Sequence, residues 1–380
     1  MFIDFYKGKK VLVTGGTGFK GAWLCEWLLM LGATVSNYSL EAPTEPSLFN
    51  LLDLEKRLTH QQADIRHRET LLQAIKAFKP DVVFHLAAQS LVRRSYQNPV
   101  DTFETNVMGT VNLMEALRQS GQACSVVVVT TDKCYENREW NHGYREEDAL
   151  GGYDPYSASK ACAEHVVAAY RRSFFNGAAG SKMALATARA GNVIGGGDWA
   201  ADRIIPDCIR SLQNGQAIRV RNKTATRPWQ HVLEPLGGYL WLACQQSRAE
   251  IKSFSELPQW DRNIFSTAFN FGPGVTSNRT VEEVVRELLK YCSGSWEDAS
   301  DPQAPHEAGK LHLSVDKAYH LLGWHPVWDF AETVKETALW YKNHLGTNTQ
   351  DRRRLIDLTR QQIQHYAQAA RQQGLNWAMA

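Results

Sequence analysis

The chain has 380 residues, of which 43% are hydrophobic and 22% are charged, and its formal net charge is +2. This length allows one large domain or two modest ones, and the composition is that of an ordinary globular protein. A charge so close to neutral excludes the basic surface that a nucleic-acid partner requires.

Cysteine usage and hydropathy indicate the expected cellular setting. The seven cysteines are odd in number and form no C-x-x-C pair, which argues against a disulfide framework and against a zinc site. No metal is therefore expected. The opening stretch "MFIDFYKGKK" has no apolar signal core, and no apolar run is long enough to span a membrane. We expect a cytoplasmic protein with no membrane partner.

The first half of the chain alternates between short apolar runs and longer amphipathic segments. Strands are predicted near residues 10–15, 33–39, 60–65, 81–88 and 124–129, and helices near residues 20–32, 68–78 and 103–114. Strands that alternate with helices form a parallel sheet with helices on both faces. The predicted fold class is therefore α/β, with a Rossmann-type doubly wound parallel sheet.

The alternation weakens after residue 190. The segment 191–207 is too rich in glycine to form a core element and is predicted to be a functional loop. A short strand near 267–272 is predicted to return to the sheet, and helices are predicted at 280–292 and 330–344. These elements predict a second, smaller region that is interleaved with the first.

The sequence predicts a division of the chain into three segments. Residues 1–190 are predicted to form the sheet domain, which the strand near 267–272 rejoins. Residues 191–345 are predicted to form most of the smaller region, with a substrate bound between the two parts. Residues 346–380 are predicted to be a helical extension, and the sequence leaves open whether it packs on the core or contacts a partner.

A glycine-rich turn joins the first strand to the first helix. The stretch "TGGTGFKG" places Gly15, Gly18 and Gly21 in G-x-x-G-x-x-G spacing. Glycine permits the tight turn and allows backbone N–H groups to approach a pyrophosphate at the positive end of the helix. The alternative is a turn that binds nothing. The position of the motif, between strand one and helix one, favours dinucleotide binding.

The residues after the second predicted strand indicate whether the dinucleotide is NAD or NADP. An acidic residue about 20 positions beyond the glycines typically binds the ribose hydroxyls of NAD. Glu41 lies 20 residues after Gly21, and the surrounding stretch has no arginine to receive a 2′-phosphate. The sequence therefore predicts NAD. Asp64, at the end of the third predicted strand, is expected to face the adenine amino group.

Tyr156 and Lys160, in "YSASK", are four residues apart on a predicted helix and so share one face. A phenol has a pKa of about 10, which makes it a poor base at neutral pH. A nearby ammonium and a positive nicotinamide ring are expected to lower that pKa. The alternative is an ordinary pair on a helix surface. Together with the glycine turn, the pair instead predicts proton removal from an alcohol while hydride leaves the same carbon.

These motifs, in this order, resemble the extended short-chain dehydrogenase/reductase family over nearly the whole chain. "TGFKGAWL", "TTDKCYEN", "GGGDWAADRIIPD" and "RPWQHVLEPLGGYLWL" resemble its nucleotide-sugar 4,6-dehydratases, and among these the group that acts on CDP-glucose. The resemblance implies a homodimer or dimer of dimers, formed through helices near 101–118 and 155–175. It implies that NAD is bound by Gly15, Thr17, Gly18, Phe19, Lys20, Gly21, Asp64, Ile65, Leu86, Ala87, Ala88, Asn106, Tyr156 and Lys160.

The resemblance also implies a reaction. Oxidation of C4 of the sugar acidifies the C5 proton, water is then eliminated across C5 and C6, and the hydride returns to C6. Thr131 is expected to hydrogen-bond near the C4 oxygen, and Asp132 is the candidate acid for the departing hydroxyl. Lys133 stands where dTDP-sugar relatives are expected to have a glutamate base. It could remove the C5 proton as a neutral amine or stabilise the enolate as an ammonium, and the sequence does not decide between the two.

The predicted substrate is a nucleotide sugar, CDP-glucose, with deoxysugar biosynthesis of the O-antigen type as its setting. The resemblance places Asn192, Arg203, Arg227 and His306 near the nucleotide, although loop arginines are usually solvated. A nucleotide-sugar 4-epimerase is the main alternative, but it needs no acid for a departing hydroxyl. A regulator that only senses NAD is the non-enzyme alternative, and it has no need of the tyrosine and lysine.

Overall fold

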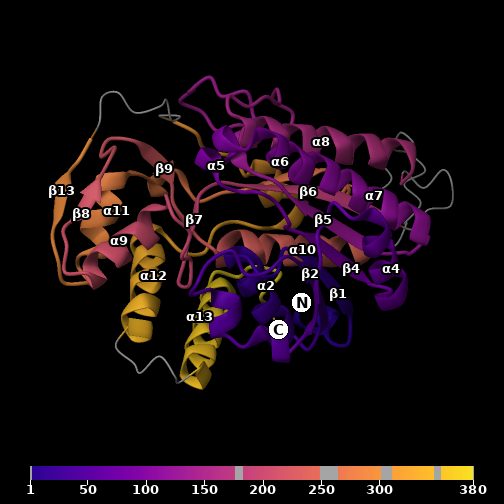
Figure 1. Ribbon diagram of the computed structural model, residues 1–380, viewed down its shortest axis with the longest axis horizontal. Coiled ribbons are helices and arrows are strands. Elements are labelled where there is room, and N and C mark those ends of the chain that lie inside the picture. The colour runs from indigo at the N-terminus through magenta and orange to yellow at the C-terminus, as the bar shows by residue number, and fades with distance from the viewer. Residues whose placement is uncertain (1, 176–182, 249–263, 301–309, 346–351, 380) are drawn as a thin grey trace.

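The computed structural model describes residues 2–175, 183–248, 264–300, 310–345 and 352–379 (Figure 1). Seven parallel strands form its central sheet. In sheet order they are β11 (Ala268–Phe271), β6 (Ala184–Ala190), β5 (Ser125–Val129), β4 (Val82–His85), β1 (Lys10–Thr14), β2 (Thr34–Ser39) and β3 (Thr59–Gln62). The order of the strands reverses between β1 and β4, where sheets of this kind bind ligands. The predicted doubly wound sheet is confirmed.

Both faces of the sheet are buried, which explains the continuous apolar strands. Val11 of β1 and Val127 of β5 belong to one hydrophobic cluster, whereas Leu12 and Val126 belong to the cluster on the opposite face. Helices α2 (Phe19–Met30) and α10 (Leu233–Arg248) cover the first face. Helices α4 (Arg68–Phe78), α7 (Gly109–Ser120) and α8 (Pro155–Ser173) cover the second (Figure 1).

Two predicted elements differ from the structure in detail. The third strand ends at Gln62, three residues before the predicted end, because the Asp64 carboxylate accepts a hydrogen bond from the Arg66 backbone N–H at 2.9 Å and turns the chain. The helix predicted at 103–114 is part of a longer run. It consists of α6 (Pro99–Phe103), a π-helical turn η2 (Glu104–Met108) and α7.

The smaller region consists of short strand pairs and helices beside the sheet. Strand β7 (Val193–Ile194) pairs with β10 (Gln230–His231), β9 (Thr226–Pro228) with β12 (Asn278–Thr280), and β8 (Ile218–Val220) with β13 (Trp296–Asp298). Its helices are α9 (Ile204–Gln213), α11 (Val281–Leu288) and α12 (Phe330–Leu345). Short helical elements elsewhere are α1 (Phe2–Tyr6), α3 (Leu48–Leu51), η1 (Leu54–Lys56), α5 (Val92–Gln97), η3 (Asp132–Cys134), η5 (Val275–Ser277) and η6 (Ala318–Leu322).

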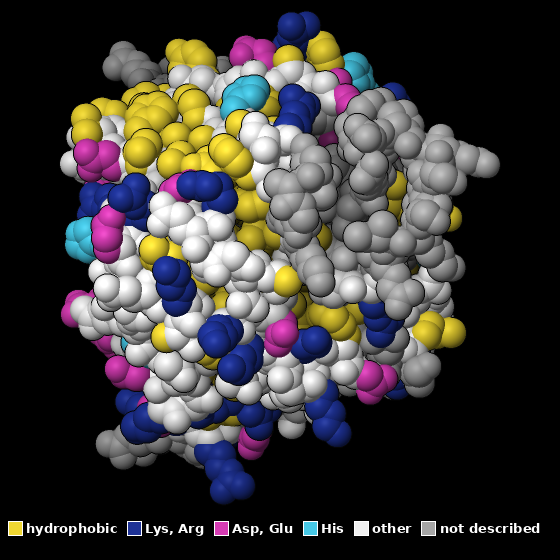
Figure 2. Space-filling model, turned by 90° about the vertical axis from the view of Figure 1, so that its right-hand side faces the viewer, with side chains coloured by type: hydrophobic (Ala, Val, Ile, Leu, Met, Phe, Trp, Pro, Cys, Tyr) yellow, Lys and Arg dark blue, Asp and Glu magenta, His cyan; other side chains and the backbone are white. Residues whose placement is uncertain are grey.

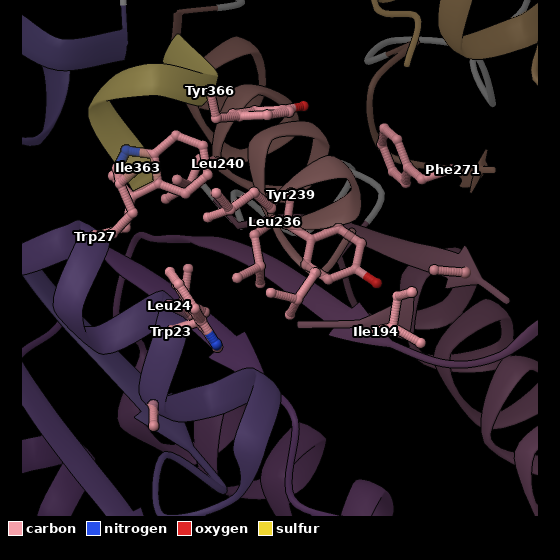
Figure 3. Packing of buried hydrophobic residues seen from close by; sticks show 14 of the residues in the cluster. Trp23, Leu24, Trp27, Ile194, Leu236, Tyr239, Leu240, Phe271, Ile363 and Tyr366 are labelled. Carbon is pink, nitrogen blue, oxygen red and sulfur yellow. The ribbon is translucent and has the colours of Figure 1, made fainter. Parts of the chain in front are cut away.

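The C-terminal helix α13 (Arg352–Gln372) packs on the core beside α2, which answers the question that the sequence left open. Tyr366 meets Trp27 of α2 edge to face, with ring centroids 5.8 Å apart, and both lie near α10 (Figure 3). Glu26, fully buried in α2, accepts charge-assisted hydrogen bonds from Arg57 and from Arg360 of α13. This packing fixes the helix that begins at the glycine turn.

Across the described parts of the chain, no helix combines the length and apolarity needed to cross a lipid bilayer.

Candidate active site

A cleft of about 3390 Å³ opens at the carboxyl ends of the strands, between the sheet and the smaller region. It brings together residues that are far apart in the sequence. The predicted site residues that line it are Gly15, Thr17, Gly18, Phe19, Lys20, Gly21, Asp64, Ile65, Leu86, Ala87, Ala88, Thr131, Asp132, Lys133, Tyr156, Lys160, Asn192, Arg203 and Arg227. Asn106 is not among the lining residues, and His306 lies outside the described residues.

The glycine turn has no room for side chains. Gly15 has φ +76°, and a Cβ there would come within 2.6 Å of the Ala87 backbone nitrogen at the end of β4. A Cβ on Gly21 would overlap the Gly15 carbonyl oxygen. A Cβ on Gly18 would lie 3.4 Å from that same carbonyl oxygen, and the residue faces the cleft. The turn is therefore a tight backbone cradle at the start of α2, which fits a pyrophosphate group.

Acidic side chains line the cleft just beyond the ends of β2 and β3. Glu41 lies on the lining with its carboxylate hydrogen-bonded to Gln62, and its charge would repel a 2′-phosphate. Arg66 is close by, but its guanidinium is bound by Asp64 and Asp101 at 2.6 and 2.9 Å. The hydrogen bonds from Arg66 hold the pKa of the Asp64 carboxyl below the ordinary value. These residues fit NAD better than NADP.

Asn106 lies beneath the cleft and supports its wall. Its amide donates hydrogen bonds to the Gln89 carbonyl and to the Ser159 hydroxyl, at 3.0 and 2.8 Å, and accepts one from the Gln89 N–H. The side chain thus joins the loop after β4 to helix α8. Any influence of Asn106 on a cofactor would pass through this loop.

Tyr156 and Lys160 stand on the first turns of α8, where the sequence predicted a shared face. Asp154 caps the helix by accepting a hydrogen bond from the Ser157 N–H, and Pro155 occupies its first position. The Lys160 ammonium donates to the carbonyl of Val129, at the end of β5, over 2.9 Å. This contact places the catalytic helix against the carboxyl edge of the sheet.

Burial dominates the proton affinities of this pair in the isolated chain. It raises the pKa of Tyr156 to about 12, although a hydrogen bond with Thr131 acts in the opposite direction. Burial lowers the pKa of Lys160 to about 8. The expected lowering of the tyrosine pKa is therefore not found in the chain alone, because desolvation penalises the phenolate.

The acid and the amine of "TTDKCY" are in direct contact. The Lys133 ammonium lies 3.3 Å from Asp132 Oδ1 and 3.2 Å from Asn192 Oδ1. Thr131 precedes them, accepts from the Lys133 N–H and donates to the Asp132 carboxylate at 3.0 Å. Asp132 is only 1% exposed, whereas the Lys133 side chain is 28% exposed. An ordinary surface salt bridge does not fit a buried carboxylate that faces the cleft.

Lys20 lies close enough to Lys160 and Asp132 for their charges to act on it. Its ammonium lies 3.4 Å from the Tyr239 hydroxyl of α10. Burial lowers the pKa of Lys20 to about 7, and the nearby charges of Arg203 and Lys160 act in the same direction. The sequence placed Lys20 with the glycine turn, and Tyr239 was not anticipated, because only the fold brings α10 under α2.

Two arginines face the cleft from the smaller region. Arg203 begins α9 and is held by Asp198 at 2.8 Å, with the Ser90 hydroxyl 3.4 Å from its other nitrogen. Arg227 lies on β9 and donates to its neighbouring Thr226 carbonyl. Asp198 was not predicted individually, although it lies in the quoted block "GGGDW".

Comparison with known proteins identifies the family. The model of the family described as GDP-mannose 4,6 dehydratase matches residues 12–337, most of the chain. The chain belongs to the GDP-mannose 4,6 dehydratase family.

Relatives within the family differ in the substrates they are named for. A CDP-glucose 4,6-dehydratase from Salmonella typhimurium is 49% identical over 345 residues, which cover 89% of this chain and 92% of the relative. A dTDP-glucose 4,6-dehydratase from Escherichia coli is 26% identical over 357 residues, covering 87% and 92%.

Solved structures share the fold. A dTDP-glucose 4,6-dehydratase from Streptomyces venezuelae, solved with NAD bound, has a TM-score of 0.72 and 26% identity, with 89% of this chain and 98% of that chain covered. A UDP-glucose 4-epimerase from Thermotoga maritima has a TM-score of 0.73 and 21% identity, with coverage of 88% and 99%. At such low identity the epimerase shows the fold alone.

Gly15→Ala is expected to abolish NAD binding, because the new Cβ would strike the Ala87 backbone and deform the cradle. Gly121→Ala is the matched control, since Gly121 also has positive φ (+63°) but no atom within 4 Å of a Cβ. Both variants should lose about 1 kcal/mol of stability from the backbone conformation. Calorimetric titration with NAD measures binding, and normal affinity in Gly15→Ala would contradict the cradle assignment.

Proposed function

We propose that this protein is a nucleotide-sugar 4,6-dehydratase that converts CDP-D-glucose to CDP-4-keto-6-deoxy-D-glucose with NAD tightly bound. The observation that carries the proposal is the joining of two pairs in one cleft. Tyr156 and Lys160 suit oxidation of an alcohol, and Asp132 and Lys133 suit elimination of water beside it. The dehydratase relative at 49% identity supports the choice of reaction and of substrate.

The cofactor would lie along the carboxyl edge of the sheet. The glycine cradle would hold its pyrophosphate, Asp64 and Ile65 would border the adenine, and Tyr156 and Lys160 would lie near the nicotinamide. NAD held there would supply the acceptor for the hydride of C4 and the donor of a hydride to C6, with no net redox change. In this arrangement residues 1–190, with β11, serve the cofactor, and most of residues 191–345 serve the nucleotide sugar.

Tyr156 is the group that takes the C4 hydroxyl proton. Its phenolate is disfavoured by burial, so it requires compensating positive charge. The Arg203 guanidinium opposes this effect of burial, and Lys160 adds a second cation on the same helix face, with its ammonium fixed by the Val129 carbonyl. Thr131 hydrogen-bonds to Tyr156 and lies at the end of β5, where its hydroxyl can orient the C4 oxygen.

Elimination then requires an acid at O6 and a group that handles the C5 proton. Asp132 is buried and faces the cleft, so it can carry the proton that the leaving hydroxyl takes. Lys133 contacts Asp132 and is partly exposed, so it can reach a sugar in the cleft. It serves either as the base at C5 or as the cation that stabilises the enolate.

The nucleotide would lie against the smaller region. Arg203 and Arg227 offer guanidinium groups that match a diphosphate, and Asn192 and His306 complete the predicted set. The assignment of cytosine rests on the CDP-glucose relative, because no contact derived from the sequence selects this base.

A second copy of the chain is the proposed partner. Val100, Phe103 and Met108 are exposed by 67%, 37% and 50% beside α8. They border a shallow apolar hollow of about 410 Å³, whose lining is Pro99, Val100, Phe103, Glu104, Val107, Met108 and Cys162. Hydrophobic side chains also gather at the upper left of the face that Figure 2 shows. Such a patch is typical of an interface between subunits.

The function is tested by incubating the protein with CDP-glucose and a trace of NAD, without added reductant. Product with the alkaline absorbance of a 4-keto sugar should exceed NAD many times over, and dTDP-glucose should be used far less efficiently. Stoichiometric release of NADH, formation of a C4 epimer, or equal efficiency on dTDP-glucose would contradict the proposal.

Lys133→Met should permit oxidation at C4 but stall elimination, lowering turnover by about 10²–10⁴-fold, the usual contribution of a proton-transfer group. The 4-keto sugar should then accumulate on the enzyme. Substrate deuterated at C5 should lose its label to solvent with wild type and keep it with the variant. Lys290→Met, which removes a surface ion pair with Glu287, is the control and should behave as wild type. Normal exchange in Lys133→Met would show that the lysine is structural.

Phe103→Glu should convert a dimer to a monomer, because it places charge in the apolar patch. Val275→Glu changes a 79% exposed hydrophobic residue elsewhere and should leave the dimer intact. Sedimentation velocity at several concentrations measures both. A wild type that stays monomeric throughout, or a dimeric Phe103→Glu, would contradict the proposed interface.

A further inference from the structure

A buried carboxylate follows the catalytic lysine on its helix. Glu164 lies four residues after Lys160 on α8, so the two side chains share a face, and both are buried. We propose that Glu164 is a positioning residue, which keeps Lys160 charged and fixes the end of β5 beside it. This inference rests on the proposed function, because it assigns Glu164 a part in that same reaction.

Glu164 connects helix α8, which carries Tyr156 and Lys160, to the ends of two neighbouring strands. Its Oε1 accepts a hydrogen bond from the Thr130 hydroxyl at 2.5 Å, immediately before Thr131. Its Oε2 accepts from the Thr187 hydroxyl at 2.8 Å and from Arg189 at 2.9 Å, both on β6. One carboxylate therefore ties α8 to the ends of β5 and β6, and a shift of this group would move Thr130 and the residue after it.

The carboxylate also forms an ion pair with Arg189, at 2.9 Å. The Arg189 and Glu164 side chains of this ion pair are only 4% and 3% exposed. The remaining contacts of Arg189 are neutral, with the Tyr135 hydroxyl and the Glu146 carbonyl. Charge interactions are strong at such depth. The combination of Glu164, Arg189 and Lys160 has a net charge of +1, with Lys160 at the end that lines the cleft.

Titratable groups from four elements surround Lys160 and influence its pKa, and Glu164 is the anion among them. Burial lowers the pKa of Lys160, and the Glu164 carboxylate raises it. The Cys134 thiol also raises it, but its own pKa is raised by burial, so it is neutral at pH 7. His85 is neutral because burial lowers its pKa to about 3. Lys20, whose pKa is about 7, can only add positive charge.

The charged state of Lys160 matters because Tyr156 needs a nearby cation to lose its proton. Without Glu164, the buried lysine would give up its proton at lower pH. On the basic side of the pH–activity profile, activity would then be lost at a lower pH than in wild type. A purely structural role for the Glu164–Arg189 pair would lower stability and leave that profile unchanged.

The test is Glu164→Gln, measured in full-length enzyme with CDP-glucose across pH. We expect kcat to fall at least 10-fold with little change in KM. The basic limb should move down by about one pH unit, since an opposite charge within about 4–6 Å shifts a pKa by 1–3 units. Independently of turnover, the rate of acetylation of Lys160, followed by mass spectrometry, should reveal a lysine that loses its proton at lower pH than in wild type. Glu164→Asp, which keeps the charge, should restore much of the wild-type profile.

Glu234→Gln is the matched control, because Glu234 is also a fully buried carboxylate but lies outside the cleft, bound by Tyr366 and the backbone near Trp328. It should leave the basic limb unchanged. If Glu164→Gln does not fold, the double variant with Arg189→Met leaves no unpaired buried cation and carries the same measurement. An unshifted limb and unshifted acetylation in an active variant would overturn the inference. A wild type inactive on CDP-glucose would instead reject the proposed function.

Discussion

The hydrogen bond from the Lys160 ammonium to the Val129 carbonyl joins the two segments that carry the proposed catalytic residues. Val129 is the last residue of β5. Thr131, Asp132 and Lys133 follow shortly after it, with Thr131 as the N-cap of the short helix that contains the other two. Lys160 and Tyr156 belong to α8. The contact therefore sets the distance between the proposed base for the C4 hydroxyl and the residues proposed to act at C5 and C6.

A charged hydrogen bond of this kind survives burial only where the surroundings favour the cation. The buried carboxylate on the next turn of α8 provides this, and it is held in turn by residues of β5 and β6. On the other face of the sheet, α13 and α10 press on α2 and fix the glycine turn. The cleft is thus supported from both faces by side chains that never reach the substrate.

Much of this could be predicted from the sequence. Strands buried on both faces read as continuous apolar runs, and so the parallel sheet was predicted. The glycine spacing, and the tyrosine and lysine four residues apart, have fixed geometry within one turn or one helix, and Gly15, Tyr156 and Lys160 all line the cleft. The end of β3 was misjudged because a side chain of Asp64 turns the chain locally.

The rest depended on contacts between distant segments. The pKa of Tyr156 was expected to be low, but its burial, which raises it, is a property of the folded cleft. Asn106 was expected at the cofactor and lies below the lining, because its partners are Gln89 and Ser159. Glu164 was overlooked, although an acidic residue one turn after the lysine was a usable signal.

In the proposed reaction, one hydride leaves C4 and returns to C6 of the same sugar within one cleft. CDP-glucose deuterated at C4 is the substrate that tests this, by mass spectrometry and NMR of the product. We expect deuterium at C6 with none in solvent, and, in a mixture with unlabelled substrate, no exchange of label between molecules. Deuterium that remains at C4, appears in released NADH, or scrambles between molecules would contradict it.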